Sequence, residues 1–394
     1  MSGTEGVGAG RVVWLLAGEA SGDILGARLM EALRRADPAL AFVGVGGARM
    51  EALGLRSLFP MQDLAVMGLV EVLPRLQLLS RRLDEVVQDI ERRRPDMIVT
   101  VDSPGFSLRL LRRTGAMGIR RVHFVAPQVW AWHQERVKDF PGLWDRLLCL
   151  LPFEVEWYAR HGLDATFVGH PVLQSGADRG DAARFRMRHG LAPDAPVVVL
   201  MPGSRRSEVP RLLPIFGAML QVLKARIPDI HPVIPISSLV AARVRKGVAR
   251  WPVPPHIVTD LNDKHDAFAA AGAALTKSGT STLELALAGV PMAVTYRVNP
   301  LTAFFARRMI KVPYVAMVNL LAGREVVPEL LQQDCAPEKL ADAVQGLLFD
   351  PSAAARQRAA FREVIDSLRP PPGFPTAADA AAADILEVMS RPVG

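Results

Sequence analysis

Short apolar runs alternate along this chain with longer segments of helical periodicity, and most of the runs end in a turn of small residues. The first run spans Arg11 to Ala17, and helical spacing follows from Ile24 to Ala36. Comparable runs occupy Asp96 to Val101, Pro196 to Met201 and Ala273 to Thr276. Continuous apolar runs of this length suit strands that are buried on both faces. The alternation therefore predicts an α/β protein built from parallel sheets with helices on both sides.

The length of the chain predicts two domains. Its 394 residues exceed the roughly 250 to 300 at which single cores stop growing, and 50% hydrophobic residues provide material for two cores. Gly169 to Val172 has the composition of a rigid hinge between two series of βα units. We expect domains at residues 1–172 and 173–394, each doubly wound and Rossmann-like, facing a cleft.

Charge and cysteine content narrow the classes of partner. The net charge of +7 indicates anionic partners, but the basic residues are scattered and no aromatic stripe alternates with them. Nucleic acid is therefore not expected, and a phosphorylated substrate or an anionic membrane surface is. Cys149 and Cys335 match no metal-binding spacing and suit a reducing cytoplasm. No run approaches the ~18 apolar residues of a membrane-spanning helix.

The second half contains a glycine turn that suits a phosphate. Lys277 to Glu284 follows an apolar run and leads into a short helix closed by Gly289. Such a turn presents backbone N–H groups and hydroxyls to an anion, and Glu284 is placed to bind a neighbouring sugar hydroxyl. The candidate contacts in the turn are Lys277, Gly279, Thr280 and Thr282. Ser281 to Glu284 also spells a capping box, which needs no ligand, and the residues alone leave both readings open.

A second turn in this half carries an arginine. Pro202-Gly203-Ser204-Arg205 follows the apolar run that ends at Met201. The guanidinium of Arg205 can bind two phosphate oxygens at once. A surface ion pair is the alternative, but the short turn at the end of a strand favours the phosphate.

In the first half, acidic residues follow two predicted strands. Glu19 and Ser21 lie in the turn Gly18 to Asp23, which lacks the dinucleotide fingerprint, and Asp102 follows the run that ends at Val101. Carboxylates at the carboxyl ends of strands face the ligand crevice of an open α/β sheet. Helix capping is the competing role for these residues.

Two tryptophans stand close together after a further predicted strand. Trp130 and Trp132 lie on the segment Gln128 to His133. Their rings can form a platform for a sugar or an acyl chain, although burial is the commoner use of tryptophan.

The stretch Leu64 to Leu79 is apolar all round and has a basic margin at Arg81 and Arg82. A segment of this kind can enter a bilayer surface. The residues that would do so are Val66, Met67, Leu69, Val70, Val72, Leu73 and Leu76. The alternative is the beginning of a core-packed helix that runs to Arg94.

Two doubly wound halves, with the phosphate-binding set in the second, are typical of a nucleotide-sugar enzyme of the GT-B type. At the level of motifs the chain resembles the lipid-A-disaccharide synthases, in the family's order from residue 11 to about residue 335. The motifs are G-E-A-S-G-D at 18–23, D-S-P-G-F at 102–106, Q-V-W-A-W at 128–132, V-G-H-P at 168–171, M-P-G-S-R at 201–205, S-G-T-S-T-L-E at 278–284 and N-L-L-A at 319–322. Val318 stands where proline is expected and Met201 where leucine is usual, which affects loop detail more than chemistry.

The resemblance implies an inverting transfer from UDP-2,3-diacylglucosamine to 2,3-diacylglucosamine 1-phosphate, giving a β-1,6 disaccharide and UDP. It also implies the roles of individual residues. Arg205, Lys277, Gly279 and Thr280 would grip the donor, Glu284 would hold the ribose, and Asn319 would support the diphosphate or the donor sugar. Asp102 would accept the proton of the attacking hydroxyl, with Glu19 in reserve, although an ordinary aspartate is a weak base at neutral pH.

The same resemblance implies a place in the cell and a set of partners. Acylated substrates lie in a membrane, so the protein is expected in the cytoplasm, bound peripherally to the inner face of the inner membrane. This raises the bilayer reading of Val66 to Leu79 above its alternative. No cofactor and no metal ion are expected, and an oligomer stays open. The GT-B plan further implies that the last helix packs back on the first domain.

Two other functions remain as alternatives. A UDP-N-acetylglucosamine 2-epimerase shares the two-domain plan and the S-G-T-x-x-x-E type of grip, but it acts on a soluble sugar and has no use for an apolar surface segment. A lipid or nucleotide carrier is the other alternative, and it would have no catalytic use for Asp102.

Overall fold

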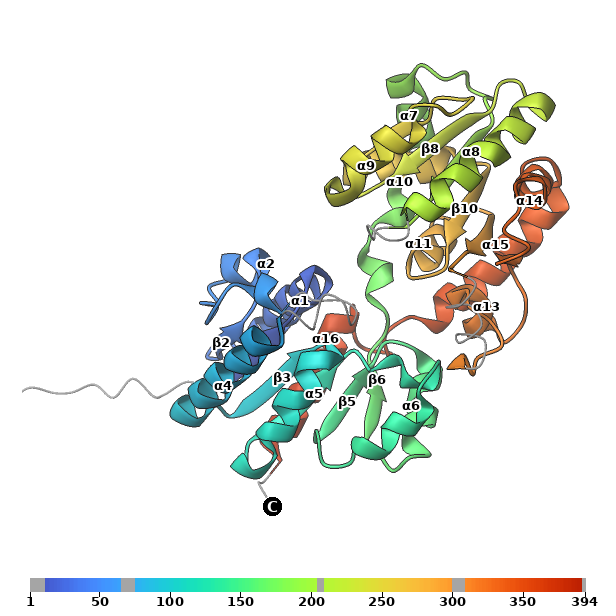
Figure 1. The fold of residues 1–394 in the computed structure, drawn as a ribbon. Coiled ribbons are helices and arrows are strands. Elements are labelled where there is room, and N and C mark those ends of the chain that lie inside the picture. Colours follow the sequence, from blue (N-terminus) through green and yellow to red (C-terminus); the bar gives the residue numbers. More distant parts are fainter. Residues whose placement is uncertain (1–10, 65–74, 204–208, 300–308, 392–394) are drawn as a thin grey trace, which may run out of the picture. The chain divides into compact units, whose positions relative to one another are not determined.

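The computed structural model describes residues 11–64, 75–203, 209–299 and 309–391. The chain forms two compact units: unit 1 comprises Met1–Pro171 with Leu368–Gly394, and unit 2 comprises Val172–Ser367. Each unit contains a six-stranded sheet in which all neighbouring strands are parallel (Figure 1). The predicted α/β fold with two Rossmann-like domains is confirmed. The chain leaves unit 1 after Pro171 and returns to it at Leu368, so residues 368–394 are not part of unit 2.

The sheet of unit 1 has the order β2-β1-β3-β4-β5-β6. Its strands are β1 Val12–Ala17, β2 Ala41–Val45, β3 Met97–Val101, β4 Arg120–Phe124, β5 Arg146–Cys149 and β6 Ala165–Phe167. The main helices are α1 Ala20–Ala36, α2 Ala48–Ala52, α4 Leu76–Arg93, α5 Pro104–Arg113, α6 Pro152–Ala159 and α16 Ala377–Ser390. The central strands β1 and β3 are buried along almost their whole length, as continuous apolar runs between two helical layers should be.

The sheet of unit 2 has the order β12-β11-β10-β7-β8-β9. Its strands are β7 Val197–Met201, β8 His231–Pro235, β9 His256–Val258, β10 Ala273–Lys277, β11 Met292–Tyr296 and β12 Glu329–Leu331. The helices are α7 Ala182–His189, α8 Val209–Arg226, α9 Ser238–Val248, α10 Leu261–Ala270, α11 Ser281–Leu287, α13 Met317–Ala322, α14 Pro337–Phe349 and α15 Pro351–Ser367.

The order of the strands fixes where ligands bind. In unit 1 the chain passes from β1 to β2 on one side and then to β3 on the other, so the strand order reverses between β1 and β3. In unit 2 the same reversal falls between β7 and β10. Open α/β sheets bind ligands beyond the carboxyl ends of the strands that flank such a reversal. Glu19, Asp102 and Lys277 all lie at these strand ends.

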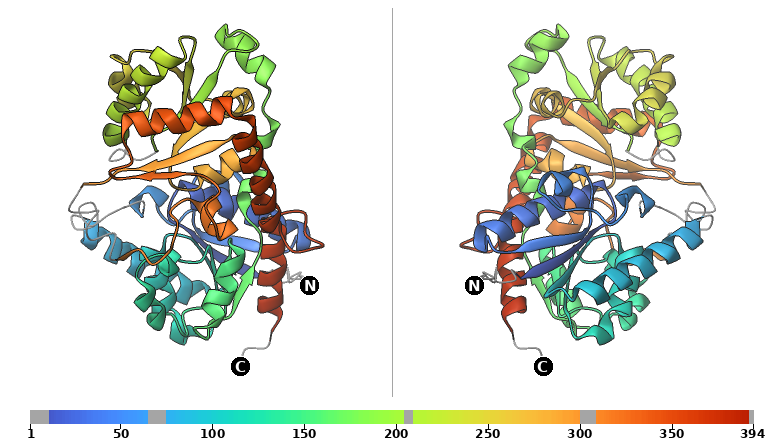
Figure 2. Two further views of the ribbon diagram at one scale, coloured as in Figure 1. Left: turned by 90° about the vertical axis from the view of Figure 1, so that its right-hand side faces the viewer. Right: turned by 90° about the vertical axis from the view of Figure 1, so that its left-hand side faces the viewer.

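The final helix belongs to unit 1 and packs against α1 (Figure 2). Arg35 of α1 pairs with Asp379 of α16 at 2.5 Å, and Arg146 of β5 pairs with Asp384 at 2.9 Å. The two chain segments that join the units are also linked, since the backbone N–H of His170 donates to the carbonyl of Leu368 at 2.9 Å.

Sequence reasoning missed two short elements of unit 2. Residues 319–332 contribute to helix α13 and to strand β12 at the edge of the sheet. β12 has three residues and carries Glu329, so no apolar run marks it. Its pairing with β11, which places Leu330 opposite Thr295, makes it a strand.

Candidate active site

Glu19 and Asp102 meet at the strand-order reversal of unit 1. Glu19 follows β1 and Asp102 follows β3, and these strands pair with Ala17 opposite Val101. The two carboxyl groups lie close enough for Glu19 to raise the pKa of Asp102. Gly18 permits this approach, because a Cβ atom at that position would lie 2.4 Å from the hydroxyl oxygen of Ser103. The two candidate catalytic residues thus form one carboxyl pair.

The backbone at this edge of the sheet adopts unfavourable conformations. Asp102 and Ser103 have φ values of +52° and +47°, and Val125, directly after β4, has +78°. A left-handed conformation costs about 1 to 3 kcal/mol for residues other than glycine and is rare for β-branched ones. Two hydrogen bonds hold it here: Asp102 N–H donates to Phe124 O at 2.8 Å, and the Ser107 hydroxyl donates to Asp102 O at 2.7 Å. Such strain is typical of functional sites.

The environment of Asp102 makes it a stronger base than an ordinary aspartate. Burial raises the pKa of Asp102, and the neighbouring Glu19 raises it further through its charge and their hydrogen bond, to about 6. The backbone N–H of Ser103 acts in the opposite direction and lowers the pKa. The weakness expected of an aspartate base at neutral pH is therefore largely removed.

The other polar residues of the 18–23 turn have different roles. Asp23 is buried and accepts hydrogen bonds from the backbone N–H groups at the start of α2: Gly47 at 2.9 Å, Arg49 at 3.0 Å and Met50 at 3.1 Å. The capping alternative is thus correct for Asp23, although it caps a neighbouring helix and not its own. Ser21 is exposed in the first turn of α1 and stays a binding candidate.

Of the two tryptophans after β4, only Trp132 is available to a ligand. Trp130 is buried and its indole N–H donates to Glu154 at 2.9 Å. Trp132 is 52% exposed. The Tyr158 hydroxyl donates to the carbonyl of Pro127 and holds the beginning of the same loop. Trp130 therefore anchors the loop in the core, whereas Trp132 stays exposed.

The glycine turn of unit 2 does not form a capping box. Helix α11 begins at Ser281, and neither its N-cap residue Thr280 nor Glu284 closes the turn by a side-chain cap. Both carboxylate oxygens of Glu284 instead accept from Lys264 of α10, at 2.9 and 2.8 Å. Gly279 has a φ of +145°, which only glycine adopts readily. The capping-box reading of Ser281 to Glu284 is therefore wrong.

Within this turn, some predicted contacts support the backbone. Thr282 is fully buried and its hydroxyl donates to Gly279 O at 2.8 Å, so a direct substrate contact by Thr282 is corrected to a supporting role. Thr280 is exposed and Gly279 is half-buried. The ammonium group of Lys277 lies 5.6 Å from the centre of the Tyr296 ring and is half-buried. These three remain placed for a ligand.

Asn319 is corrected in the same way. Its side chain is fully buried, and its amide donates to Val327 O at 2.8 Å and to Glu329 at 2.9 Å. Its amide oxygen accepts from the N–H groups of Val326 and Val327, at 2.8 and 2.9 Å. These bonds use both donors and both acceptor positions of the amide, so none remains for a substrate. Asn319 positions the loop that follows α13.

Two positioning residues were missed by sequence reasoning. Glu329 accepts from the backbone N–H groups of Val315 and Ala316 at about 3 Å, and the Ser278 hydroxyl of the glycine turn donates to Val315 O. The glycine turn, residues 315–316 and the loop after α13 thus form one hydrogen-bonded assembly. Lys264, which pairs with Glu284, is the other missed residue. Neither lies in a recognisable motif, so no local signal identifies it.

Several predicted residues lie outside the described part of the chain. Arg205 is one, and Val66, Met67, Leu69, Val70, Val72 and Leu73 of the apolar segment are the others. Leu76, the last of that set, begins α4 and is 41% exposed. The helix of the alternative reading is present as α4; Leu78 and Leu79 in its first turn are half-buried, and its fully buried residues begin at Val86.

Within the described residues, no group of three or more histidine, cysteine, aspartate or glutamate side chains is arranged to hold a metal ion. None of the helices formed by those residues is both long and apolar enough to cross a bilayer. Cys149 and Cys335 are buried free thiols.

Comparison with solved structures shows the fold. The S. aureus MnaA–UDP co-structure superimposes with a TM-score of 0.63 at 14% identity, covering 97% of this chain and 98% of that one. The calicheamicin glycosyltransferase CalG4 gives a TM-score of 0.59 at 18% identity, with 97% and 98% covered. At these identities the likeness extends to the two-domain architecture and no further.

Comparison of sequences shows the family. The family model described as lipid-A-disaccharide synthetase matches residues 13–372. The lipid-A-disaccharide synthase of Gluconobacter oxydans is 67% identical over 384 residues, covering 98% of this chain and 92% of the relative. That of Granulibacter bethesdensis is 59% identical, covering 96% and 99%. The epimerase alternative is not favoured. The chain belongs to the lipid-A-disaccharide synthetase family, and it is a glycosyltransferase.

Proposed function

We propose that this protein transfers diacylglucosamine from UDP-2,3-diacylglucosamine to 2,3-diacylglucosamine 1-phosphate. The products are lipid A disaccharide 1-phosphate, joined by a β-1,6 bond, and UDP. The observation that carries the proposal beyond family membership is the carboxyl pair of Glu19 and Asp102, which adjacent strands β1 and β3 bring together at the strand-order reversal of unit 1. A base of raised pKa at that place is what activation of a sugar hydroxyl requires.

Unit 1 binds the acceptor and activates it. Ionised Asp102 accepts the proton of the 6-hydroxyl as that oxygen attacks the anomeric carbon of the donor. Attack from the face opposite the departing UDP inverts the configuration at this carbon. A pKa of about 6 leaves Asp102 mostly ionised at neutral pH while keeping it basic enough to accept a proton. Burial and the neighbouring Glu19 together raise this pKa, and Trp132 offers a flat apolar surface for the sugar or an acyl chain.

Unit 2 holds the donor. The backbone N–H groups at Gly279 and Thr280, with Lys277 and Arg205, offset the negative charge that develops on the UDP leaving group. Glu284, oriented by Lys264, accepts a hydrogen bond from a ribose hydroxyl. With these groups the leaving group is stabilised by the protein's own residues.

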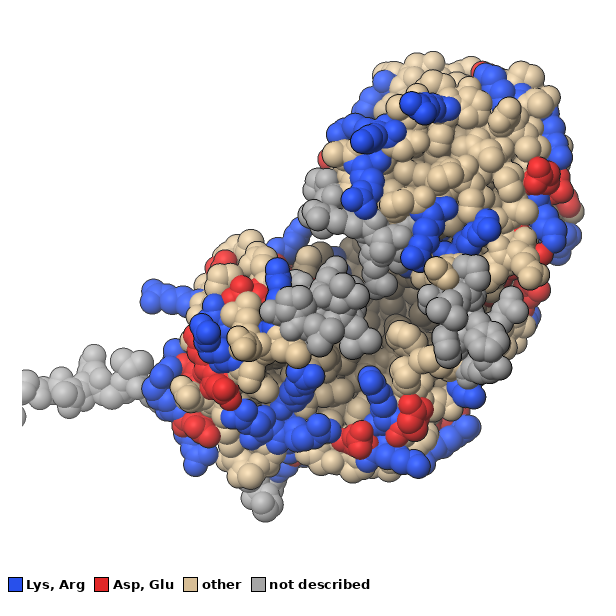
Figure 3. Space-filling view, in the orientation of Figure 1, with Lys and Arg blue, Asp and Glu red and all other residues tan. Residues whose placement is uncertain are grey.

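The acylated substrates place the reaction at a membrane surface. We propose peripheral binding to the inner face of the inner membrane through Val66 to Leu76. Exposed Leu76 at the start of α4, with exposed Arg75 and Arg81 beside it, supports this assignment. Basic side chains are otherwise spread over the face drawn in Figure 3 and do not gather in one stripe.

The experiment that tests the proposal identifies the product. The purified protein is incubated with both diacylated sugars, and the product is analysed by mass spectrometry and by NMR of the new glycosidic bond. A β-1,6 disaccharide 1-phosphate is expected from the wild type. Asp102→Asn, which keeps the shape of the side chain, should form it about 10² to 10⁴ times more slowly. An α-linked product, or a 2-epimerised UDP-sugar, would contradict the proposal.

A further inference from the structure

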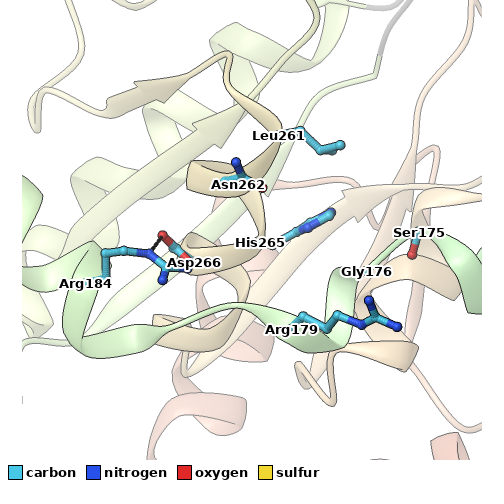
Figure 4. A pocket seen from close by; sticks show the side chains of 8 residues that line it. All are labelled: Ser175, Gly176, Arg179, Arg184, Leu261, Asn262, His265 and Asp266. Carbon is cyan, nitrogen blue, oxygen red and sulfur yellow. Dashed lines mark hydrogen bonds and ion pairs between the residues drawn. The ribbon is translucent and has the colours of Figure 1, made fainter.

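Unit 2 contains a pocket of about 220 Å³ beside the first turns of α10, and the side chain of His265 lines it (Figure 4). Lys264, the residue before His265, pairs with Glu284. This pocket therefore belongs to the donor side of the proposed reaction. The acceptor side lies in unit 1, where a loop follows strand β4.

The β4 loop, residues 125–133, begins next to Asp102 and is strained at both ends. The backbone N–H of Asp102 donates to the carbonyl of Phe124, the residue before the loop, at 2.8 Å. Val125 and His133, the first and last residues of the loop, have φ values of +78° and +67°. Residues other than glycine keep such conformations only where the surrounding structure holds them. The β4 loop therefore needs anchors outside itself.

Helix α6 supplies these anchors through three side chains. Glu154 accepts from the indole N–H of Trp130 at 2.9 Å, and both side chains are buried. Phe153 packs against the Trp130 ring edge to face, with the ring centres 4.8 Å apart. The hydroxyl of Tyr158 donates to the carbonyl of Pro127. These contacts fix the loop between its two strained ends.

Glu154 has a second bond that offers a simpler explanation for its presence. It accepts from the backbone N–H of Leu151 at the start of α6, at 3.1 Å, which caps the helix. Capping requires no burial, however, and Glu154 is only 2% exposed. Burial penalises its charged form and raises its pKa to about 7, and the hydrogen bond from Trp130 acts in the opposite direction. The bond to Trp130 is what the buried position adds.

We propose that Glu154 is a positioning residue for the acceptor: by holding Trp130 it fixes the β4 loop so that the exposed ring of Trp132 meets the acceptor sugar or its acyl chain. The inference rests on the proposed function and adds a residue that touches neither substrate. Trp132 makes the contact, and Glu154 acts through it. Loss of the anchor should weaken binding of the acceptor and leave binding of the donor, which depends on unit 2, unchanged.

A double-mutant cycle on Glu154 and Trp132 tests this role, with kcat and KM measured for each of the two diacylated sugars. Glu154→Gln keeps the shape of the side chain, but its single amide oxygen cannot accept from both Trp130 and Leu151. It should raise KM for the acceptor about tenfold and leave KM for the donor and the affinity for UDP nearly unchanged. Trp132→Ala should raise the same KM. The double variant should be no worse than Trp132→Ala alone, because the ring through which Glu154 acts is gone.

Two further variants separate positioning from stability. Tyr158→Phe removes the hydroxyl that donates to the Pro127 carbonyl and leaves Glu154 in place. It should also raise KM for the acceptor, and again not when Trp132 is already alanine. Glu156→Gln is the matched control, because Glu156 lies on the same helix and is exposed, and both KM values should stay as in the wild type.

The outcomes separate this inference from the function on which it rests. Thermal unfolding first establishes that each variant is folded; if Glu154→Gln is not, Tyr158→Phe with and without Trp132→Ala decides. An effect of Glu154→Gln that is equally large in the Trp132→Ala background, or that falls on KM for the donor, overturns the positioning role. So does an unchanged acceptor KM in Trp132→Ala, and disaccharide formation by the wild type then leaves the proposed function standing. If the wild type forms no disaccharide, the proposed function fails as well.

Discussion

At the scale of single residues, the proposed proton transfer depends on the carboxyl pair of Glu19 and Asp102. Because the pKa of Asp102 is raised to about 6, the aspartate is protonated, and lost as a base, as the pH falls through that value. We therefore expect kcat/KM to fall below about pH 6 in the wild type. Glu19→Gln removes a negative neighbour, which lowers the pKa of Asp102 and moves this acidic limb to lower pH.

The measurement is a pH–rate profile of both proteins between about pH 4.5 and 8, with circular dichroism at each pH as a control for unfolding. An acidic limb that stays in place after Glu19→Gln would show that Glu19 does not set the basicity of Asp102. A limb that moves upward would contradict the sign of the coupling.

Sequence reasoning located Glu19 and Asp102 separately but not as a pair. Each follows an apolar run, which is a local signal. Their contact depends on β1 lying next to β3 and on Gly18 lying against Ser103, which are properties of the fold. The raised pKa of Asp102 follows from the same contact, so the sequence could not reveal it.

At the scale of elements, the glycine turn and α11 are the most informative part of unit 2. Glu284→Gln replaces a charged partner of Lys264 with a neutral one and weakens the acceptor for a ribose hydroxyl. We expect about a tenfold loss of UDP affinity and little change in melting temperature, measured by calorimetry and thermal unfolding. Lys264→Met is the matched control: if the ion pair alone mattered, both variants would lose the same affinity. Wild-type affinity in Glu284→Gln would remove Glu284 from the site.

Asn319 allows a test of structure against direct binding. Asn319→Leu leaves the N–H groups of Val326 and Val327 and the carbonyl of Val327 without their Asn319 partner. Each unsatisfied buried group costs about 1 to 3 kcal/mol, so we expect a loss of at least ~3 kcal/mol in the free energy of unfolding, measured by urea denaturation. A variant of normal stability that fails to bind UDP would instead indicate that Asn319 contacts the substrate directly.

The elements that were predicted and those that were missed differ in length and in where their partners lie. Central strands such as β1, β3, β7 and β10 are continuous apolar runs, because both of their faces are covered by helices. β12 is too short for such a run. The role of its Glu329 depends on distant residues, because its carboxylate accepts hydrogen bonds from the backbone N–H groups of residues 315 and 316. That Glu284 closes no capping box likewise depends on a residue of a different helix, Lys264, which pairs with its carboxylate.

At the scale of the whole molecule, the protein must reach substrates that lie in a membrane. Val66, Leu69, Val72 and Leu76 replaced together by serine should prevent co-sedimentation with vesicles of anionic phospholipid, because the apolar surface that enters the bilayer is removed. Thermal unfolding should be nearly unchanged, since Leu76 is exposed and the core contacts of α4 begin at Val86. A large loss of stability would favour the alternative of a core-packed helix.

The central claim is that this chain joins two acylated sugars, and release of UDP tests it most directly. Purified protein is mixed with UDP-2,3-diacylglucosamine alone, with 2,3-diacylglucosamine 1-phosphate alone, and with both, and free UDP is measured. Free UDP is expected only when both sugars are present, in amounts equal to the disaccharide formed. Release from the donor alone at the same rate would indicate a hydrolase, and no release with both sugars present would contradict the account.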